Sequence, residues 1–326
     1  MLTLKRTQKG IALITALLAV SLATIVAVNM TERQQYDIRR AANQLQQQQA
    51  MYYALGGEQW ARGLLKRDYD HDKKNKWVDS LNEDWAQELP QTAVEGGFVA
   101  GKIEDLQGKF NLNNLYLDAK ASEADAQLQK AQVEMFQRLL KVLEIDAPIA
   151  QAIIDWVDPD SDITFPNGAE DAAYQNKTPP YRTANQRMAS PSELLLVEGV
   201  TPEIYEKLLP FVCTLPGPSV VNVNTAPAEV IAALSSQLDL QKAQNIIDDN
   251  NTGFEEFKDF LDVAKPYVTN LTQFEQTTRP LTGVNSRYFL LHADVQVDRI
   301  TQQLFSVLER GQNGYVRVVS RSPGVE

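Results

Sequence analysis

Acidic side chains, whose oxygen atoms suit a hard cation, cluster near the middle of the chain. They are Asp155, Asp158, Asp160, Asp162, Glu170 and Asp171. Calcium in proteins takes about six to eight oxygen ligands, so such a run could hold it. The spacing is not that of an EF-hand, because the sixth and twelfth residues counted from Asp158 are Ile163 and Ala169. Spacing alone therefore fits either a solvated acidic loop or a calcium site.

Catalytic motifs do not occur in the sequence. The two histidines, His71 and His292, lie far apart along the chain, and no serine triad, P-loop or Gly-x-Gly-x-x-Gly pattern is present. Asp155 and Asp158 could form a catalytic carboxylate pair, but ligation of a cation explains them at least as well. The single cysteine, Cys213, stands among apolar residues and is predicted to be buried. We therefore expect a protein that is not an enzyme.

Residues 221–227 and 254–257 resemble the helix-hairpin-helix module of DNA-uptake proteins. Such modules bind phosphate through a glycine-rich hairpin with basic neighbours, whereas residues 235–240 contain no glycine and Asp248-Asp249 follow them. The formal net charge of -11 also disfavours a nucleic-acid surface. We expect these helices to be a packing scaffold, with a membrane-tethered DNA-uptake (competence) factor as the alternative function.

The elements that position these residues begin with a membrane segment. Lys5, Arg6 and Lys9 precede an apolar run over residues 11–28, which as a helix would be about 27 Å long. The positive-inside tendency places residues 1–10 in the cytoplasm and the rest of the chain outside the inner membrane. A plain signal anchor fits this pattern, whereas a cleaved signal peptide fits it poorly.

Gly10-Ile11 after Lys9 resembles the site that prepilin peptidase cuts in type IV pilin-like leaders. That resemblance implies a mature chain that begins at Ile11, which can be N-methylated. Pilins usually carry glutamate five residues after the cut, where this chain has Thr15. In the family the glutamate pairs with the terminal amine of the subunit ahead, and an unpaired carboxylate in hydrocarbon is costly. Thr15 therefore indicates a subunit with none ahead of it, at the tip of a fibre.

Beyond the membrane the chain alternates between a β region, a helical block and a second β region. Apolar spacing near three and four predicts that the first helix continues to residue 67. Residues 98–106 and 109–113 are predicted to pair as a hairpin, and the residue pattern at 289–297, 303–310 and 315–321 predicts three more strands. Helices are expected over 127–143 and 149–157. Residues 190–195 and 225–231 begin two similar helical-hairpin units.

These blocks together resemble the minor pseudopilin K family of type II secretion. The resemblance covers nearly the whole chain and is carried by Gly10-Ile11 and by residues 51–56, 103–113, 155–158, 168–171, 179–182 and 221–227. It implies an α+β, type IV pilin-like fold in which a long N-terminal transmembrane helix packs on an antiparallel sheet, with a large inserted all-α domain. The implied parts are a leader (1–10), an N-terminal helix (11–67, in the membrane over about 11–30), a pilin-like domain (68–117 and 281–326) and a helical insert (118–280).

The resemblance also implies function and partners. The chain is expected to form the tip of a periplasmic pseudopilus with minor pseudopilins I and J and other pseudopilins, and to help initiate assembly and export of folded proteins. It implies one or two structural Ca²⁺ ions in the insert, with Asp158, Asp160, Asp162, Glu170, Asp171 and Asp155 as ligands. The expected location is the bacterial inner membrane, crossed once, with the bulk of the chain in the periplasm.

Overall fold

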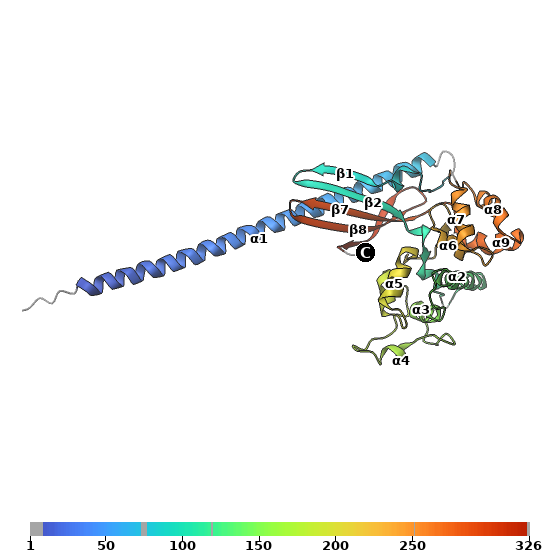
Figure 1. Ribbon diagram of the computed structural model, residues 1–326, viewed down its shortest axis with the longest axis horizontal. Coiled ribbons are helices and arrows are strands. Elements are labelled where there is room, and N and C mark those ends of the chain that lie inside the picture. Colours follow the sequence, from blue (N-terminus) through green and yellow to red (C-terminus); the bar gives the residue numbers. More distant parts are fainter. Residues whose placement is uncertain (1–8, 73–76, 119, 251, 325–326) are drawn as a thin grey trace, which may run out of the picture.

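One long helix dominates the shape of the molecule (Figure 1). The structure is a computed structural model that describes residues 9–72, 77–118, 120–250 and 252–324, so most of the predicted leader lies outside the described residues. Helix α1 runs without interruption from Lys9 to Asp72. Its first 40 or so residues project freely, whereas Ala50, Ala54, Ala61 and Leu65 are fully buried at spacings of four and seven residues. This stripe packs the second half of α1 onto the sheet.

The sheet has five antiparallel strands in the order β1-β2-β7-β8-β9. Their bounds are β1 (Leu89–Val94), β2 (Gly97–Asp105), β7 (Tyr288–Val297), β8 (Ile300–Arg310) and β9 (Val316–Pro323). Alternate residues of β7 from Phe289 to Val297 are buried in the same apolar cluster as α1, which confirms the face predicted from the alternating pattern. The three strands predicted in the C-terminal region are also confirmed.

The predicted pairing of residues 98–106 with 109–113 is wrong. Strand β2 instead pairs with β1 on one side and β7 on the other. Strand β3 (Phe110–Asn111) pairs in parallel with β4 (Val212–Cys213). The reason is the 3₁₀ helix η2 (Leu106–Gly108), which begins where the Asp105 carboxylate accepts the Gln107 amide and directs the chain away from the sheet. A period-two pattern predicts a strand but does not identify its neighbour.

The helical block leaves the sheet after β2 and returns at β7, so it is an insert between two adjacent strands. Its α-helices are α2 (Glu123–Val142), α3 (Ile149–Val157), α4 (Asp171–Tyr174), α5 (Pro202–Leu208), α6 (Ala228–Ala233), α7 (Leu240–Asp248), α8 (Phe257–Ala264) and α9 (Leu271–Thr278). The helices gather beyond one end of the sheet (Figure 1). Their apolar faces share one core, in which Phe110 stacks on Phe136 with ring centroids 5.1 Å apart. A long helix on an antiparallel sheet, with a large helical insert, is the predicted fold class.

Short elements complete the chain. They are the 3₁₀ helices η1 (Asp84–Ala86), η3 (Leu112–Leu115), η4 (Pro191–Leu196), η5 (Leu209–Phe211), η6 (Lys265–Tyr267) and η7 (Arg279–Leu281), and the parallel pair β5 (Val221–Asn222) and β6 (Thr282–Gly283). The two similar segments at 190–195 and 225–231 fold differently, because η4 is 3₁₀ and α6 is an α-helix. In η4 the Ser190 hydroxyl accepts the amide of Ser192, two residues on, which suits the tighter turn.

Candidate functional site

The first half of α1 is a candidate membrane span. It is the one helix among the described residues that is long and apolar enough to cross a membrane, judged by length and composition. The Thr15 hydroxyl donates within the helix to the carbonyls of Ile11 and Ala12, at 3.1 and 3.0 Å. Because its donor is satisfied inside its own helix, Thr15 needs no partner in hydrocarbon, unlike a carboxylate at that position.

The predicted metal ligands lie at the end of α3 and in the loop that follows it. Asp155, in the last turn of α3, is fully buried, and its two carboxylate oxygens accept the Thr164 amide at 3.1 and 3.2 Å. A Cβ on Gly168 would overlap Asp155 Oδ2, so glycine is required where the loop returns. Asp155 therefore fixes both arms of the loop to the helix.

Asp158 and Glu170 form the electrostatic centre of this loop. Burial, followed by the negative charges of Asp160, Asp155 and Glu170, raises the pKa of Asp158 to about 7. Burial also raises the pKa of Glu170. Asp158 Oδ1 and Glu170 Oε1 are buried without a hydrogen-bond partner among the described residues. A buried acceptor without a hydrogen bond costs free energy, and so does repulsion between neighbouring carboxylates. A bound cation would reduce both costs.

The other predicted ligands are less central. Asp160 accepts the Asp162 amide at 2.8 Å, and Asp162 itself is exposed. Asp171 accepts the Thr183 hydroxyl at 3.0 Å, and its side chain is more exposed than that of Glu170. In the part of the chain that the structure describes, the six predicted ligands do not form a group with oxygens all within 4.8 Å of one another.

Asn185 is a candidate ligand that the sequence analysis missed. Its side-chain oxygen is buried with no hydrogen-bond partner among residues 9–72, 77–118, 120–250 and 252–324, while its side-chain nitrogen donates to the Asp160 carbonyl. Its backbone has φ +45°, a conformation that asparagine tolerates better than most residues. The sequence carried little signal for it, because a lone asparagine after a proline-rich turn is common.

A second acidic group lies at the junction of helix and sheet. The carboxylates of Asp68, Asp79 and Glu83 have oxygens within 4.8 Å of one another. The guanidinium of Arg310, which is fully buried, donates to Asp68 at 2.9 Å and also to Asp79. A fixed cation thus already pairs with two of the three carboxylates, so a bound metal ion is not needed to explain this group.

Residues 103–113 and 221–227, two of the segments that carry the family resemblance, meet around one buried carboxylate. Asp105 accepts hydrogen bonds from the Ser286 and Thr225 hydroxyls, both at 2.6 Å, from the Gln107 amide at 2.8 Å and from Asn222 Nδ2 at 3.1 Å. Burial nonetheless raises its pKa to about 6. Asp105 ends strand β2, and its donors come from the start of the insert (Gln107), from its middle (Asn222 and Thr225) and from its end (Ser286). The two segments therefore act as a structural joint.

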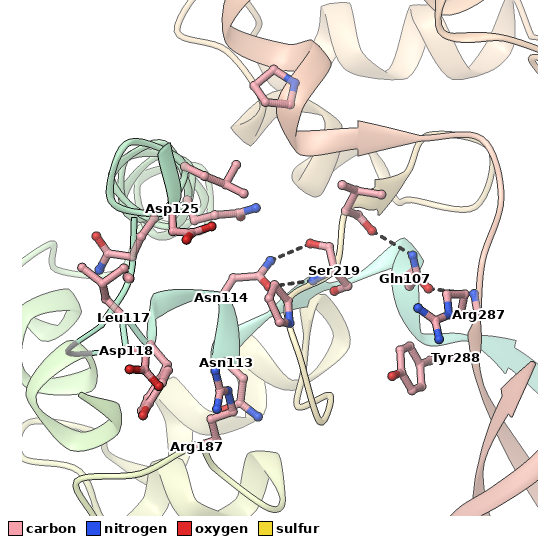
Figure 2. Close-up of a pocket in the computed structure, with 18 of the residues that line it drawn as sticks. Gln107, Asn113, Asn114, Leu117, Asp118, Asp125, Arg187, Ser219, Arg287 and Tyr288 are labelled. Atoms are coloured by element: carbon pink, nitrogen blue, oxygen red, sulfur yellow. Dashed lines mark hydrogen bonds between the residues drawn. The ribbon is translucent and has the colours of Figure 1, made fainter. Parts of the chain in front are cut away.

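A cleft of about 810 Å³ opens between the insert and the start of β7 (Figure 2). Gln132 Oε1, at the cleft, has no hydrogen-bond partner among the described residues, whereas two other amides of the lining are bonded. Asn114 donates to the Ser219 carbonyl at 2.8 Å, and Gln107 donates to the Val220 carbonyl at 3.1 Å and accepts the Arg287 amide at 2.7 Å. Asn114 and Gln107 hold the walls of the cleft together. The cleft thus continues the joint around Asp105.

The helical hairpin formed by α6 and α7 does not present a phosphate site. Asp239 caps α7 by accepting the Lys242 amide at 2.9 Å, so an acidic group occupies the helix N-terminus, where a phosphate would bind. Lys242 is drawn back to the hairpin, where it donates to the Gln237 carbonyl at 2.9 Å. Buried side chains such as Val230 and Ile246 face the core of the insert. The hairpin is a packing element.

Comparisons with known proteins identify one family. The sequence model of "Type II secretion system (T2SS), protein K" matches residues 108–217 and 221–278. The chain is 38% identical to the type II secretion system protein K of Pseudomonas aeruginosa over 98% of this chain and 94% of that protein. It is 33% identical to the protein K of Aeromonas hydrophila over 98% of both chains.

A solved structure with a similar fold is also known. In the crystal structure of the GspK-GspI-GspJ complex from the enterotoxigenic Escherichia coli type 2 secretion system, one chain superposes with a TM-score of 0.76 at 26% identity. The match covers 88% of this chain and all of the other.

Proposed function

The chain belongs to the type II secretion system protein K family, and we propose that it forms the tip of a periplasmic pseudopilus together with minor pseudopilins I and J. It is a minor pseudopilin of the type II secretion system. The observation that carries the tip proposal is the insert, which occupies the chain between β2 and β7 and projects from the end of the sheet (Figure 1). Such bulk could not be repeated along a narrow fibre.

The structural comparison supports pseudopilins I and J as partners. The related chain was solved in a complex named for GspK, GspI and GspJ, and it matches this chain over nearly its whole length. This similarity supports assembly of the present chain with its own pseudopilins I and J. The relatives belong to a secretion machine, which supports a structural role without catalysis and does not favour DNA uptake.

The N-terminal sequence supports a maturation route for the tip subunit. Prepilin peptidase would cut between Gly10 and Ile11, leave the apolar half of α1 in the inner membrane and expose Ile11 for N-methylation. The rest of the chain would lie in the periplasm, as the positive charges before the span suggest. Thr15 then suits a subunit that has a neighbour below it in the fibre and none above.

Secretion in a strain that lacks the chain tests this function. Folded type II substrates should accumulate in the periplasm, and the wild-type chain supplied in trans should restore their export. Gly10→Trp should block the cut, keep the chain at its precursor size and fail to restore export. Normal export without the chain would refute the proposal.

Calcium in the loop after α3 is the second part of the proposed function. Asp158, Glu170 and Asn185 each bury an oxygen that lacks a hydrogen-bond partner among the described residues, and a hard cation prefers such oxygens. Asp155, Asp160, Asp162 and Asp171 would complete the ligand set directly or position it. Burial and then the neighbouring negative charges raise the pKa of Asp158. The ion would offset both effects and so fix a long loop that lies at the edge of the insert.

Thermal unfolding of the full chain in detergent, with calcium or with chelator, tests this ion. Ligand binding to the folded state alone stabilises it by about 2.7 kcal/mol at a hundredfold excess over Kd. The unfolding temperature should therefore rise with calcium and rise much less with magnesium, which dehydrates reluctantly and needs stricter geometry. Equal unfolding temperatures in calcium and in chelator would refute a structural ion.

A further inference from the structure

The cleft between the insert and the start of β7 contains a buried side chain with an unused hydrogen-bond acceptor. Gln132 lies in α2, lines the cleft and is only 4% exposed, and its Oε1 has no hydrogen-bond partner in the described part of the chain. Gln129, one turn earlier on the same side of α2, donates its side-chain amide to the Leu115 carbonyl at 3.0 Å. A buried amide oxygen without a donor costs free energy. Gln132 therefore offers an acceptor to a group that enters the cleft.

An arginine at the same cleft has no anionic partner (Figure 2). The guanidinium of Arg187 lies 3.9 Å from the centre of the Tyr116 ring, and its side chain makes no ion pair or hydrogen bond with residues that the structure describes. The next residue is fixed at its backbone, because the Met188 amide donates to Asn113 at 2.8 Å and the Met188 carbonyl accepts from Asn113 at 2.9 Å. Stacking on an aromatic ring and a fixed backbone position the guanidinium, which matches a carboxylate through two parallel N–H groups. Arg187 is therefore a preformed partner for a carboxylate.

The other charged groups of the cleft are already engaged. Arg287 pairs with Glu309 at 3.0 Å. Asp125 belongs to the capping box of α2 and lies at the helix N-terminus, where a negative charge is favourable. Asp118 accepts the Lys120 amide at 2.9 Å, and these two neighbouring side chains carry opposite charges. The charge that is left without a partner at the cleft is therefore positive.

Apolar side chains form much of the remaining wall. The volume of about 810 Å³ lies within the range of sites that enclose a small ligand or a few residues of a peptide. The apolar lining is contributed by Leu117, Leu128, Pro218, Val220, Pro280 and Tyr288. The cleft thus combines an apolar wall with one unused acceptor and one unpaired cation, which is the usual composition of a ligand site.

We propose that this cleft binds an extended acidic peptide segment of a second polypeptide. A backbone N–H of the peptide donates to Gln132 Oε1, a carboxylate of the peptide accepts from Arg187, and its apolar side chains lie against the wall. A fatty acid would satisfy the arginine and the apolar wall but has no N–H for the glutamine. The proposal goes beyond the role at the tip of the pseudopilus and does not depend on it.

Binding of a defined peptide to the full chain in detergent tests the charge requirement. The probe is a fluorescein-labelled Leu-Val-Glu peptide, followed by fluorescence anisotropy, and the same detergent in every sample cancels uptake of the probe by micelles. Replacing glutamate by glutamine and amidating the C-terminus should weaken binding about tenfold or more, and so should Arg187→Gln. Arg299→Gln is the matched control, because Arg299 is also exposed but lies in the turn between β7 and β8, outside the cleft. It should leave the affinity within about twofold of wild type.

Gln132→Leu separates a binding role from a structural one. The substitution removes a buried acceptor that has no donor, so the unfolding temperature of the free chain should stay the same or rise. Affinity for the acidic peptide should nevertheless fall about fivefold or more. A peptide with N-methylated backbone amides should bind wild type more weakly and should lose nothing further with Gln132→Leu.

Three results would overturn the proposal. They are no binding of the acidic peptide to the wild-type chain, equal affinity for the acidic and the neutral peptide, and unchanged affinity with either Arg187→Gln or Gln132→Leu. Tighter binding of decanoate than of the acidic peptide would identify a fatty-acid site and would also overturn it. Secretion does not enter any of these measurements, so their failure would leave the proposed function untouched.

Discussion

Replacing Arg310 by methionine should remove the charge on which the junction of helix and sheet depends. The guanidinium is fully buried, donates to Asp68, Asp79 and the Ser286 carbonyl, and lies 4.9 Å from the centre of the Phe289 ring. Removing one partner of a buried ion pair costs about 3–5 kcal/mol, because the other charge is left without compensation. We expect the unfolding temperature of the full chain in detergent to fall by about 6 °C or more.

Arg317→Met is the matched control for this variant. Arg317 also pairs with a carboxylate, that of Glu309, but two thirds of its side chain is exposed. Glu309 is buried but keeps a second partner, Arg287 at 3.0 Å, when Arg317 is replaced. An exposed cation contributes about 0–1 kcal/mol to such a pair, so this variant should unfold close to wild type. Equal losses of unfolding temperature in the two variants would refute the reasoning, because a fully buried guanidinium and an exposed one would then contribute equally.

The effect of Arg310→Met should also depend on pH. Burial raises the pKa of Asp79, and Arg310 opposes that rise. Without Arg310 the pKa of Asp79 in the folded chain should be higher still. A carboxyl group whose pKa is raised by folding stabilises the fold below its unfolded pKa and loses that contribution as pH rises through its folded pKa. The difference in unfolding temperature between Arg310→Met and wild type should therefore become smaller as the pH is lowered. A difference that does not depend on pH would contradict this account.

Three further predictions concern separate parts of the chain. Thr15→Glu would leave a carboxylate unpaired in hydrocarbon at a cost of about 2.5–3.5 kcal/mol, so it should reduce export in a complementation assay while Thr15→Ser does not. Asp105→Asn would turn an amide N–H toward hydrogen-bond donors, so the unfolding temperature should fall. Wild type should lose stability as the pH rises from about 4 to 6, because folding raises the pKa of Asp105, and the variant should lack this loss when melting is measured across pH. Asp158→Asn should abolish most of the calcium-induced rise in unfolding temperature, and Asp162→Asn, at an exposed position, should keep it; equal responses would contradict the assignment of Asp158 as a central ligand.

Local patterns in the sequence were sufficient for the elements with a strong period. The apolar run from Ile11 and the three- and four-residue spacing after it predicted one long helix, and the helix extends one turn further, to Asp72. Alternation from Phe289 to Val297 predicted both the strand and its buried face. The acidic run after α3 could be found because six carboxylates near one another in a sequence are conspicuous. Each of these signals lies within a few residues, which is the range over which backbone geometry sets a period.

Tertiary structure alone decided which distant segments meet. Phe110 pairs with Val212 and not with its near neighbour in β2, because η2 turns the chain out of the sheet. Asn185 reaches the acidic loop from a segment more than twenty residues away, and Arg310 finds Asp79 across most of the chain. No local period encodes such contacts, since burial and charge pairing depend on where the whole chain folds.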